Sequence, residues 1–308
     1  MNVLITGSSG QIGTNLALAL LDRGDRVVGV DNRENTWTRR VETVVADLIR
    51  ARPGDLPEAK HFDLVVHLAA NAKVHELVEH PQRAMDNISM AFNVLEYCRQ
   101  NKLPLVFASS REVYGDIQRH ITHEAEADFV VAESPYSASK IAGEAMIYSY
   151  AECYDLPFLV FRFSNVYGRY DNDIERLERV IPLFIDRIAR DEPIVVFGRE
   201  KVLDFTYIDD CIAGVVAGID ALAQRRVTKQ TINLAFGQGN TLVDMVTIIG
   251  LALQKSPKVR YEPSRVGEVT RYVADITKAR ALLGYNPTVP LSEGLVRTVE
   301  WSRKWAGK

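Results

Sequence analysis

The sequence predicts an α/β fold, a doubly wound parallel sheet followed by a smaller C-terminal α/β lobe. Three observations support this prediction. Short apolar runs alternate with longer amphipathic segments through the first half of the chain, a glycine-rich turn follows the first apolar run, and the sequence becomes more charged and less periodic after Gly168. Alternation of this kind is typical of βαβ units, whose parallel strands are buried on both faces.

The elements follow in chain order. The segments "QIGTNLALALLDRG" and "MAFNVLEYCRQNK" have helical spacing, and Ser134 and Pro135 suit the cap and first turn of a helix that runs to Tyr154. "FLVFRFSNVYG" predicts one further buried strand, "VIPLFIDRIARD" a short helix and "PIVVFG" a strand. The earlier strands are predicted from four apolar runs: "NVLIT", "RVVGVD", "DLVVHLAA" and "PLVFASS".

The chain of 308 residues is long enough for two lobes around a shared cleft. We assign residues 1–168, together with about 204–236, to the sheet domain. Residues 169–203 and 237–308 are assigned to the second lobe. Neither internal repeats nor low-complexity linkers interrupt this division.

Composition narrows the classes of partner. With 47% hydrophobic and 25% charged residues and a net charge of -3, the chain has no basic surplus that would attract nucleic acid or an anionic membrane, so small molecules are the expected ligands. Three separated cysteines, Cys98, Cys153 and Cys211, argue against a disulfide framework and against a zinc site. Because no signal-peptide core or membrane-spanning run is visible either, we expect a cytoplasmic protein.

A glycine-rich turn, "TGSSGQIG", lies between the first predicted strand and the first predicted helix. Gly7, Gly10 and Gly13 would allow a tight turn and close approach of the backbone to a pyrophosphate at the helix N-terminus. Asp31 closes the second apolar run 18 residues after Gly13, where a carboxylate accepts hydrogen bonds from an adenosine ribose and repels a 2′-phosphate. The pattern favours NAD over NADP, although Arg33 lies nearby.

Tyr136 and Lys140 are four residues apart on the helix that begins near Pro135, so both side chains lie on one face. A tyrosine serves as a general base near neutral pH only if its pKa falls by roughly 3 from about 10, and a neighbouring ammonium acts in that direction. Alone, this pair would equally describe an ordinary surface helix. After a nucleotide-binding turn and a serine-rich strand end, it indicates acid–base chemistry.

Together these motifs resemble the extended short-chain dehydrogenase/reductases, and among them the NAD-dependent nucleotide-sugar epimerase/dehydratase family, notably the UDP-glucose 4-epimerases. The resemblance covers essentially the whole chain. It implies a Rossmann-type NAD-binding domain, a nucleotide-sugar-binding second lobe and a homodimer packed through helices near 88–101 and 135–153. The matching segments are "TGSSGQIG", "HLAA", "SSREVYG", "YSASK", "RFSNVYG", "DFTYIDD" and "RVGEVTRYVADITKARALLGYNP".

The resemblance also implies roles for individual residues. Ser110, Tyr136 and Lys140 would be catalytic, with the tyrosine as base, and Tyr136 and Lys140 would also contact the cofactor. The other residues expected to bind NAD are Gly7, Gly10, Gln11, Ile12, Gly13, Asp31, Asn32, Asp47, Leu48, Leu68, Ala69, Ala70, Asn87, Ser109 and Phe163. Those expected to bind the nucleotide sugar are Ser110, Arg111, Glu112, Asn165, Phe197 and Arg265.

Members of this family share oxidation at the sugar C4 and differ in the later steps of the reaction. Glu112 matches a glutamate of the dehydratases and decarboxylases, but Arg111 stands where the dehydratases have an acid, and an arginine cannot donate a proton at useful pH. Leu203 replaces an arginine that the family usually has, which argues against decarboxylation and removes a diphosphate contact for which Arg199, Lys201 or Arg176 could compensate.

We therefore expect a 4-epimerase that uses tightly bound NAD and acts through a transient 4-keto sugar, with UDP-glucose, UDP-galactose, or a related UDP-hexose or uronate as substrate. Arg111 could bind a uronate carboxylate or be solvated. The alternatives are a dehydratase, a uronate decarboxylase and a non-catalytic NAD-bound scaffold. We expect no metal, since His120, His123, Glu124 and Glu126 have the character of polar loop residues.

Overall fold

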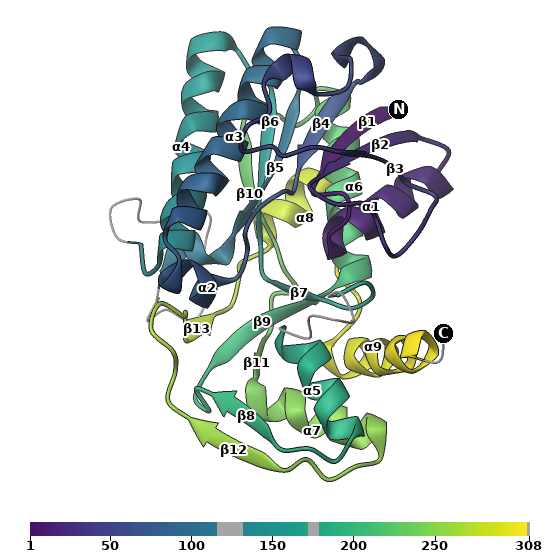
Figure 1. The fold of residues 1–308 in the computed structure, drawn as a ribbon, viewed down its shortest axis with the longest axis vertical. Coiled ribbons are helices and arrows are strands. Elements are labelled where there is room, and N and C mark those ends of the chain that lie inside the picture. The colour runs from purple at the N-terminus through teal and green to yellow at the C-terminus, as the bar shows by residue number, and fades with distance from the viewer. Residues whose placement is uncertain (116–131, 172–178, 307–308) are drawn as a thin grey trace.

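The computed structural model describes residues 1–115, 132–171 and 179–306. Seven parallel strands form its main sheet, in the order β10-β6-β5-β4-β1-β2-β3 (Figure 1). The order reverses between β1 and β4, which creates the crevice where ligands bind in doubly wound sheets. This sheet confirms the predicted fold class. The strands are β1 (Asn2–Thr6), β2 (Arg26–Asp31), β3 (Glu42–Val45), β4 (Leu64–His67), β5 (Leu105–Ser110), β6 (Phe158–Phe163) and β10 (Gln230–Leu234).

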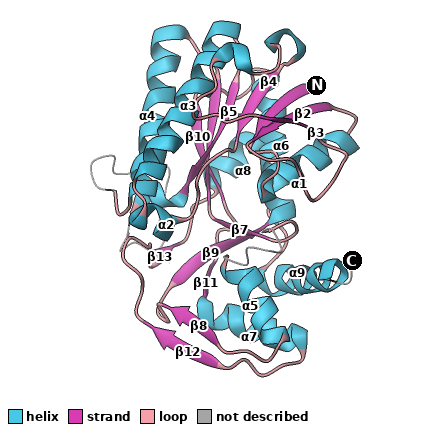
Figure 2. Ribbon diagram, in the orientation of Figure 1, coloured by secondary structure: helices cyan, strands magenta, loops and turns pink. Residues whose placement is uncertain are grey.

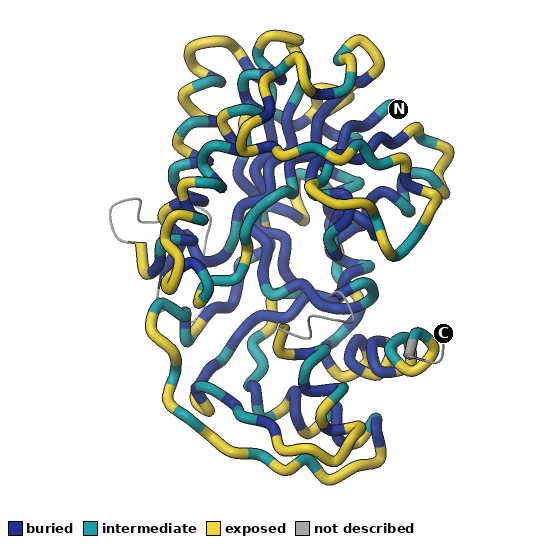
Figure 3. The backbone as a smooth tube through the Cα atoms, viewed as in Figure 1, coloured by how far each residue is buried: buried dark blue, intermediate teal, exposed yellow. Residues whose placement is uncertain are grey.

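Helices cover both faces of the sheet (Figure 2). Helices α1 (Gln11–Asp22) and α6 (Ile208–Ala223) pack together on one face, and α3 (Gln82–Asn101) and α4 (Pro135–Tyr154) pack together on the other. Side chains alternate along each strand, so Val3 and Ile5 join the core on one face while Leu4 joins the core on the other. The strands other than the edge strand β3 are accordingly buried along almost their whole length (Figure 3).

The smaller lobe holds two short sheets. Strands β7 (Asn165–Tyr167), β9 (Val202–Tyr207), β11 (Gly239–Thr241) and β13 (Arg271–Tyr272) form the first, and β8 (Ile194–Phe197) pairs with β12 (Val259–Glu262) in the second. Helices α5 (Val180–Ala189), α7 (Leu242–Leu253) and α9 (Leu291–Ala306) pack together there. Helix α8 (Thr277–Leu283) instead contacts α6 and β10, and α2 (Val74–Glu79) contacts α4.

One predicted strand is wrong: residues 158–168 form two strands rather than one. The chain leaves the main sheet at Ser164, whose hydroxyl is 2.5 Å from the Thr206 hydroxyl, and β7 then pairs with β9 in the smaller lobe. The segment around 204–236 is also shared, because β9 belongs to the small sheet whereas α6 and β10 belong to the large domain. The division into two lobes at the predicted boundaries stays a proposal.

No helix among the described residues is both long enough and apolar enough to cross a membrane.

Candidate active site

The glycine-rich turn is built so that side chains are excluded at two positions. Gly7 has φ +74°, and a Cβ there would lie 2.6 Å from the backbone nitrogen of Ala69. At Gly13 a Cβ would lie 2.1 Å from the carbonyl oxygen of Gly7. Gly10 differs, since a Cβ there would meet only that same oxygen, at 3.4 Å. Gly10 thus faces open space at the N-terminus of α1, where backbone N–H groups can receive a pyrophosphate.

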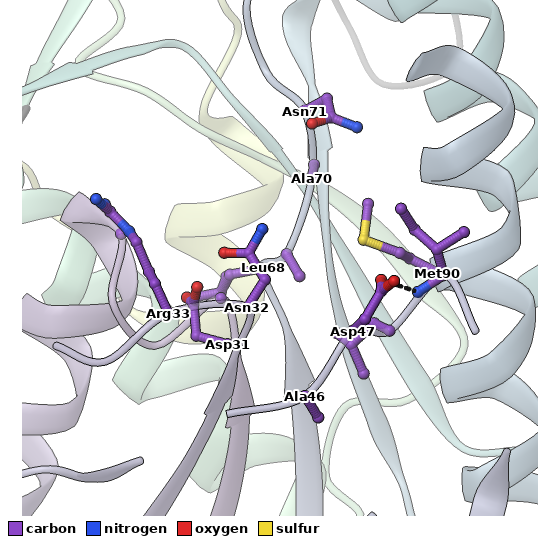
Figure 4. Close-up of a pocket in the computed structure, with 14 residues that line it drawn as sticks. Asp31, Asn32, Arg33, Ala46, Asp47, Leu68, Ala70, Asn71 and Met90 are labelled. Carbon is purple, nitrogen blue, oxygen red and sulfur yellow. Dashed lines mark hydrogen bonds between the residues drawn. The ribbon is translucent and has the colours of Figure 1, made fainter. Parts of the chain in front are cut away.

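A pocket of about 250 Å³ opens beside this turn. Asp31 and Asn32, at the end of β2, line one side of it, and Asp47 lies on the other side (Figure 4). The Ser9 backbone N–H donates to the Asp31 carboxylate at 2.9 Å. Burial raises the pKa of Asp31, and that hydrogen bond together with the Arg33 charge partly opposes the rise.

The pocket contains most of the residues predicted to hold the adenosine half of NAD, and an acidic group stands where a ribose would lie, so the residues fit this cofactor. The predicted residues that line it are Gly7, Gly10, Asp31, Asn32, Asp47, Leu48, Leu68, Ala69 and Ala70. Arg33, noted in the sequence beside Asp31, lines it as well, and so do Ala46, Ile49, Asn71 and Met90, which sequence reasoning did not single out. Gln11, Ile12, Gly13, Asn87, Ser109 and Phe163 are not among the lining residues.

Asn87 connects a loop that lines the pocket to a neighbouring helix. Its side-chain oxygen accepts from the Asn71 backbone N–H at 2.7 Å, and its amide nitrogen donates to the Asn71 carbonyl at 3.0 Å and to the Ser139 hydroxyl at 3.1 Å. The residue therefore ties the loop after β4 to helix α4. In this structure it positions the predicted cofactor site rather than lining it.

Helix α4 presents the predicted catalytic pair. It begins as predicted, with the Ser134 hydroxyl accepting from the Ser137 backbone N–H at 3.1 Å and Pro135 in the first turn. Tyr136 and Lys140 are both buried on the same helix face, with the Lys140 ammonium 5.9 Å from the centre of the Tyr136 ring. The ammonium donates to the Ala108 carbonyl of β5 at 2.8 Å, which fixes it beside the strand that ends at Ser110.

Ser110 connects this pair to the end of β5. Its hydroxyl accepts from the Glu112 backbone N–H at 3.2 Å and caps the short turn Arg111–Tyr114. The same side chain acts on the Tyr136 phenol and lowers its pKa, as a hydrogen-bond donor to the phenolate does. The structure thus brings Ser110, Tyr136 and Lys140 together from two separate elements.

The electrostatics of the phenol differ from the simple expectation that Lys140 lowers its pKa. Burial raises the pKa of Tyr136 to about 12, although the hydrogen bond from Ser110 and the charges of Arg111 and Arg179 act in the opposite direction. Burial also lowers the pKa of Lys140 to about 8. Without a ligand, burial therefore favours the protonated form of the phenol near neutral pH.

A buried ion pair joins β6 to α4 near the site, and the sequence analysis did not predict it. Arg162 on β6 donates to both carboxylate oxygens of Glu144 on α4, at 3.0 and 2.6 Å, and Ser109 donates to one of them at 2.5 Å. Ser109 is thus committed to this network instead of facing the predicted cofactor pocket. Its only sequence signal is that Glu144 follows Lys140 by one helical turn.

Arg111 and Glu112 are not solvated. They are 9% and 5% exposed, and Nη2 of the arginine is 2.8 Å from Oε1 of the glutamate. The guanidinium also lies 5.8 Å from the centre of the Tyr272 ring on β13. Both charges act on the pKa of Tyr136, so the pair belongs to the neighbourhood of the predicted base.

The predicted nucleotide-sugar residues of the smaller lobe are partly brought together. The Arg265 guanidinium lies 4.0 Å from the centre of the Phe197 ring. Asn165 donates its amide to the Asp204 carbonyl at 2.9 Å, which ties β7 to β9.

Position 203, where the family usually has an arginine, is buried in this structure. Leu203 is buried, and Lys201 is buried and paired with Glu268 at 2.6 Å. Arg199 stacks on Tyr261 at 4.9 Å from the ring centre. Arg176, the remaining candidate replacement, lies outside the described residues.

The residues considered for a metal, His120, His123, Glu124 and Glu126, also lie outside the described residues. Within residues 1–115, 132–171 and 179–306, no group of three or more histidine, cysteine, aspartate or glutamate side chains is arranged to hold a metal ion.

Known proteins are similar to this chain in sequence and in fold. A family model for the NAD dependent epimerase/dehydratase family matches residues 3–235. The chain is 33% identical to UDP-glucuronate 4-epimerase 1 of Arabidopsis thaliana, over 100% of this chain and 78% of that protein. It is 31% identical to a putative UDP-glucose 4-epimerase of Methanocaldococcus jannaschii, over 98% of each.

Two solved structures are similar over nearly the whole chain. One is the UDP-glucose 4-epimerase of Thermotoga maritima with UDP-glucose, at a TM-score of 0.90 and 29% identity, covering 99% of this chain and 100% of that chain. The other is the UDP-glucuronic acid 4-epimerase of Bacillus cereus in complex with UDP-glucuronic acid and NAD, at a TM-score of 0.90 and 28% identity, with the same coverage.

Proposed function

Because the chain belongs to the NAD-dependent epimerase/dehydratase family, we propose that it is a nucleotide-sugar 4-epimerase that acts on a UDP-hexose or a related UDP-sugar. The observation that carries this proposal is the convergence of Ser110, Tyr136 and Lys140 at the end of β5, in the domain that also holds the pocket beside the glycine-rich turn. The relatives named as UDP-glucose and UDP-glucuronate 4-epimerases support the same reaction.

The cofactor's role follows from the site. Gly7, Gly10 and Asp31 would hold NAD through its pyrophosphate and ribose. When bound, NAD would supply reversible hydride transfer at the sugar C4 and a positive nicotinamide charge near the phenol. In the chain alone, burial raises the pKa of the Tyr136 phenol to about 12. A positive charge beside the phenol would lower that pKa.

The chain's own residues would move the proton. Tyr136 would remove the proton of the sugar 4-hydroxyl, and Ser110 would donate a hydrogen bond to the phenolate and so stabilise it. Lys140, anchored on the Ala108 carbonyl, would stabilise the phenolate electrostatically. After the ketone has turned over in the pocket, returning the proton from Tyr136 to the 4-oxygen, as the hydride returns to the opposite face of C4, would complete an epimerisation with no further acid or base.

Dehydration is the second candidate, and the observation in its favour is the buried Glu112 carboxylate near Tyr136. Against it, Arg111 occupies the position next to this glutamate and is ion-paired to it. Decarboxylation is less well supported, since Leu203 is buried where an arginine would be needed.

The test is the reaction of the NAD-loaded protein with a panel of UDP-hexoses and UDP-uronates in deuterium oxide, read by NMR and mass spectrometry. We expect a product of unchanged mass, inverted at C4, with no carbon-bound deuterium. Loss of water with deuterium at C5 or C6 would establish dehydration instead, and release of carbon dioxide would establish decarboxylation. An absence of any product, with no reduction of bound NAD, would favour a non-catalytic scaffold.

A further inference from the structure

The Arg111–Glu112 ion pair leaves one hydrogen-bonding atom of each partner unused. The contact joins Nη2 to Oε1 at 2.8 Å, while Nη1 of Arg111 and Oε2 of Glu112 are buried and have no hydrogen-bond partner among the described residues. Buried polar atoms without a partner are rare, because each one loses its hydrogen bonds to water and gains none in the protein. A donor and an acceptor left over in the same pair indicate a site for a group that can both accept and donate.

The pair is fixed in place next to the predicted base. The Arg111 guanidinium lies over Tyr272, whose ring stacks on that of Tyr114 with 5.9 Å between centres. The Glu112 backbone N–H donates to the Ser110 hydroxyl, which in turn contacts Tyr136. A sugar whose 4-hydroxyl reaches Ser110 and Tyr136 would therefore bring its neighbouring substituents to this pair.

The surrounding charge does not favour another anion. The cations with the largest effect on Glu112 are Arg111 and Lys201. Arg111 is paired with Glu112 itself, and Lys201 is paired with Glu268 at 2.6 Å. The carboxylates of Glu133 and Glu268 add negative charge that acts on Glu112. Both cations are therefore already balanced, and an incoming carboxylate would be an excess negative charge in a buried setting.

We propose that the free edge of the Arg111–Glu112 pair binds a neutral substituent of the sugar beside C4, with the hydroxymethyl group of a hexose as the expected occupant, and discriminates against a uronate carboxylate. A hydroxyl accepts from Nη1 and donates to Oε2, so both unused atoms gain a partner. A carboxylate only accepts, so it would place its oxygens against Glu112. This inference rests on the proposed function and narrows its substrate class, and it reverses the sequence-based idea that Arg111 binds a uronate.

Turnover of the NAD-loaded wild type gives the first test. We expect kcat/KM for UDP-galactose to exceed that for UDP-galacturonate at least tenfold, which is equivalent to about 1.4 kcal/mol. Equal values, or a preference for the uronate, would overturn the inference. If neither sugar is turned over, the proposed function fails, and the inference is then decided by binding. Calorimetric Kd values for UDP-glucose and UDP-glucuronate, measured with NAD-loaded Tyr136→Phe, should show the same preference.

The Glu112→Gln variant tests the cause of the preference. Glutamine keeps the size and one acceptor but removes the negative charge, which frees Arg111 for a carboxylate. We expect the uronate-to-hexose ratio of kcat/KM, or of 1/Kd, to rise at least tenfold. Glu133→Gln is the matched control, because it removes an exposed carboxylate of the same neighbourhood, and its ratio should change less than about threefold. An unchanged ratio in Glu112→Gln refutes the charge argument; should that variant not fold, the wild-type and Tyr136→Phe ratios decide.

Discussion

Replacing Lys140 by methionine should abolish most activity and yet stabilise the protein at pH 7. Lys140 is buried, and its pKa is lowered from 10.5 to about 8. The protonated side chain is thus held in the folded state at a free-energy cost of about 3 kcal/mol. Methionine removes that cost and loses the hydrogen bond to the Ala108 carbonyl, worth about 1 kcal/mol. We expect Lys140→Met to be about 2 kcal/mol more stable at pH 7.

The pH dependence distinguishes this reasoning from a simple packing effect. Because the pKa is depressed in the folded state, the folded protein releases this proton first, between about pH 8 and 10.5, and the unfolded chain binds more protons in that window. Wild-type stability should therefore rise with pH there, which shrinks the advantage of Lys140→Met by about 2 kcal/mol between pH 7 and 9.5.

The assay is urea denaturation of nucleotide-free protein at those two pH values, followed by circular dichroism. Lys60→Met is the control, because the side chain of Lys60 is 71% exposed and its replacement should track the wild type at both pH values. If the stability difference between Lys140→Met and the wild type is the same at pH 7 and 9.5, Lys140 is not a buried ammonium with a depressed pKa, and the electrostatic account of the site is wrong.

Three further outcomes are expected. Tyr136→Phe should lower turnover by roughly 10²-fold or more while the melting temperature and NAD binding persist; near-normal turnover would mean that another group takes the proton. Calorimetry should show tighter binding of NAD than of NADP, and Asp31→Ala should reduce that preference about tenfold, whereas equal affinities in the wild type would remove the role given to Asp31. Light scattering should find a homodimer at micromolar concentration, and a monomeric wild type would contradict this. Phe92→Glu, at a 46% exposed position of α3, should dissociate the dimer, whereas the control Leu251→Glu on α7 should not.

Local patterns predicted the parts of the fold that local physics determines. The turn between β1 and α1 requires a positive φ at Gly7 and backbone contact at Gly13, and only glycine satisfies both, so the residue type alone carries the information. Likewise, a serine hydroxyl followed by proline suits a helix start, and α4 begins there with Ser134 as its cap. Asp31 could be placed at the pocket because it closes a strand whose end is recognisable from its apolar run.

Partners distant in the sequence determine the features that were missed. Residues 158–167 are mostly apolar, and nothing in them shows that β7 would pair with β9, a strand some 40 residues further on, so the change of sheet at Ser164 was not predicted. The bonds of Asn87 to Asn71 and Ser139 were not predicted either, since these residues become neighbours only after folding, whereas a contact of Asn87 with the cofactor stays a prediction.

The same distinction explains why the role of the "SSREVYG" segment could not be decided from its letters. An arginine followed by a glutamate at a strand end is most often a solvated pair, and a solvated pair would be indifferent to the substrate's charge. Here the ring of Tyr272, on β13, packs against the arginine. Lys201, a cation that could otherwise pair with a substrate carboxylate, is already ion-paired with Glu268. An ion pair at the protein surface contributes little to the free energy. A buried pair with no other unpaired cation nearby is more sensitive, and adding a single charge changes its energy strongly. If the proposed preference is found, substrate choice in this protein depends on contacts from the smaller lobe and not on Ser110, Tyr136 and Lys140 alone.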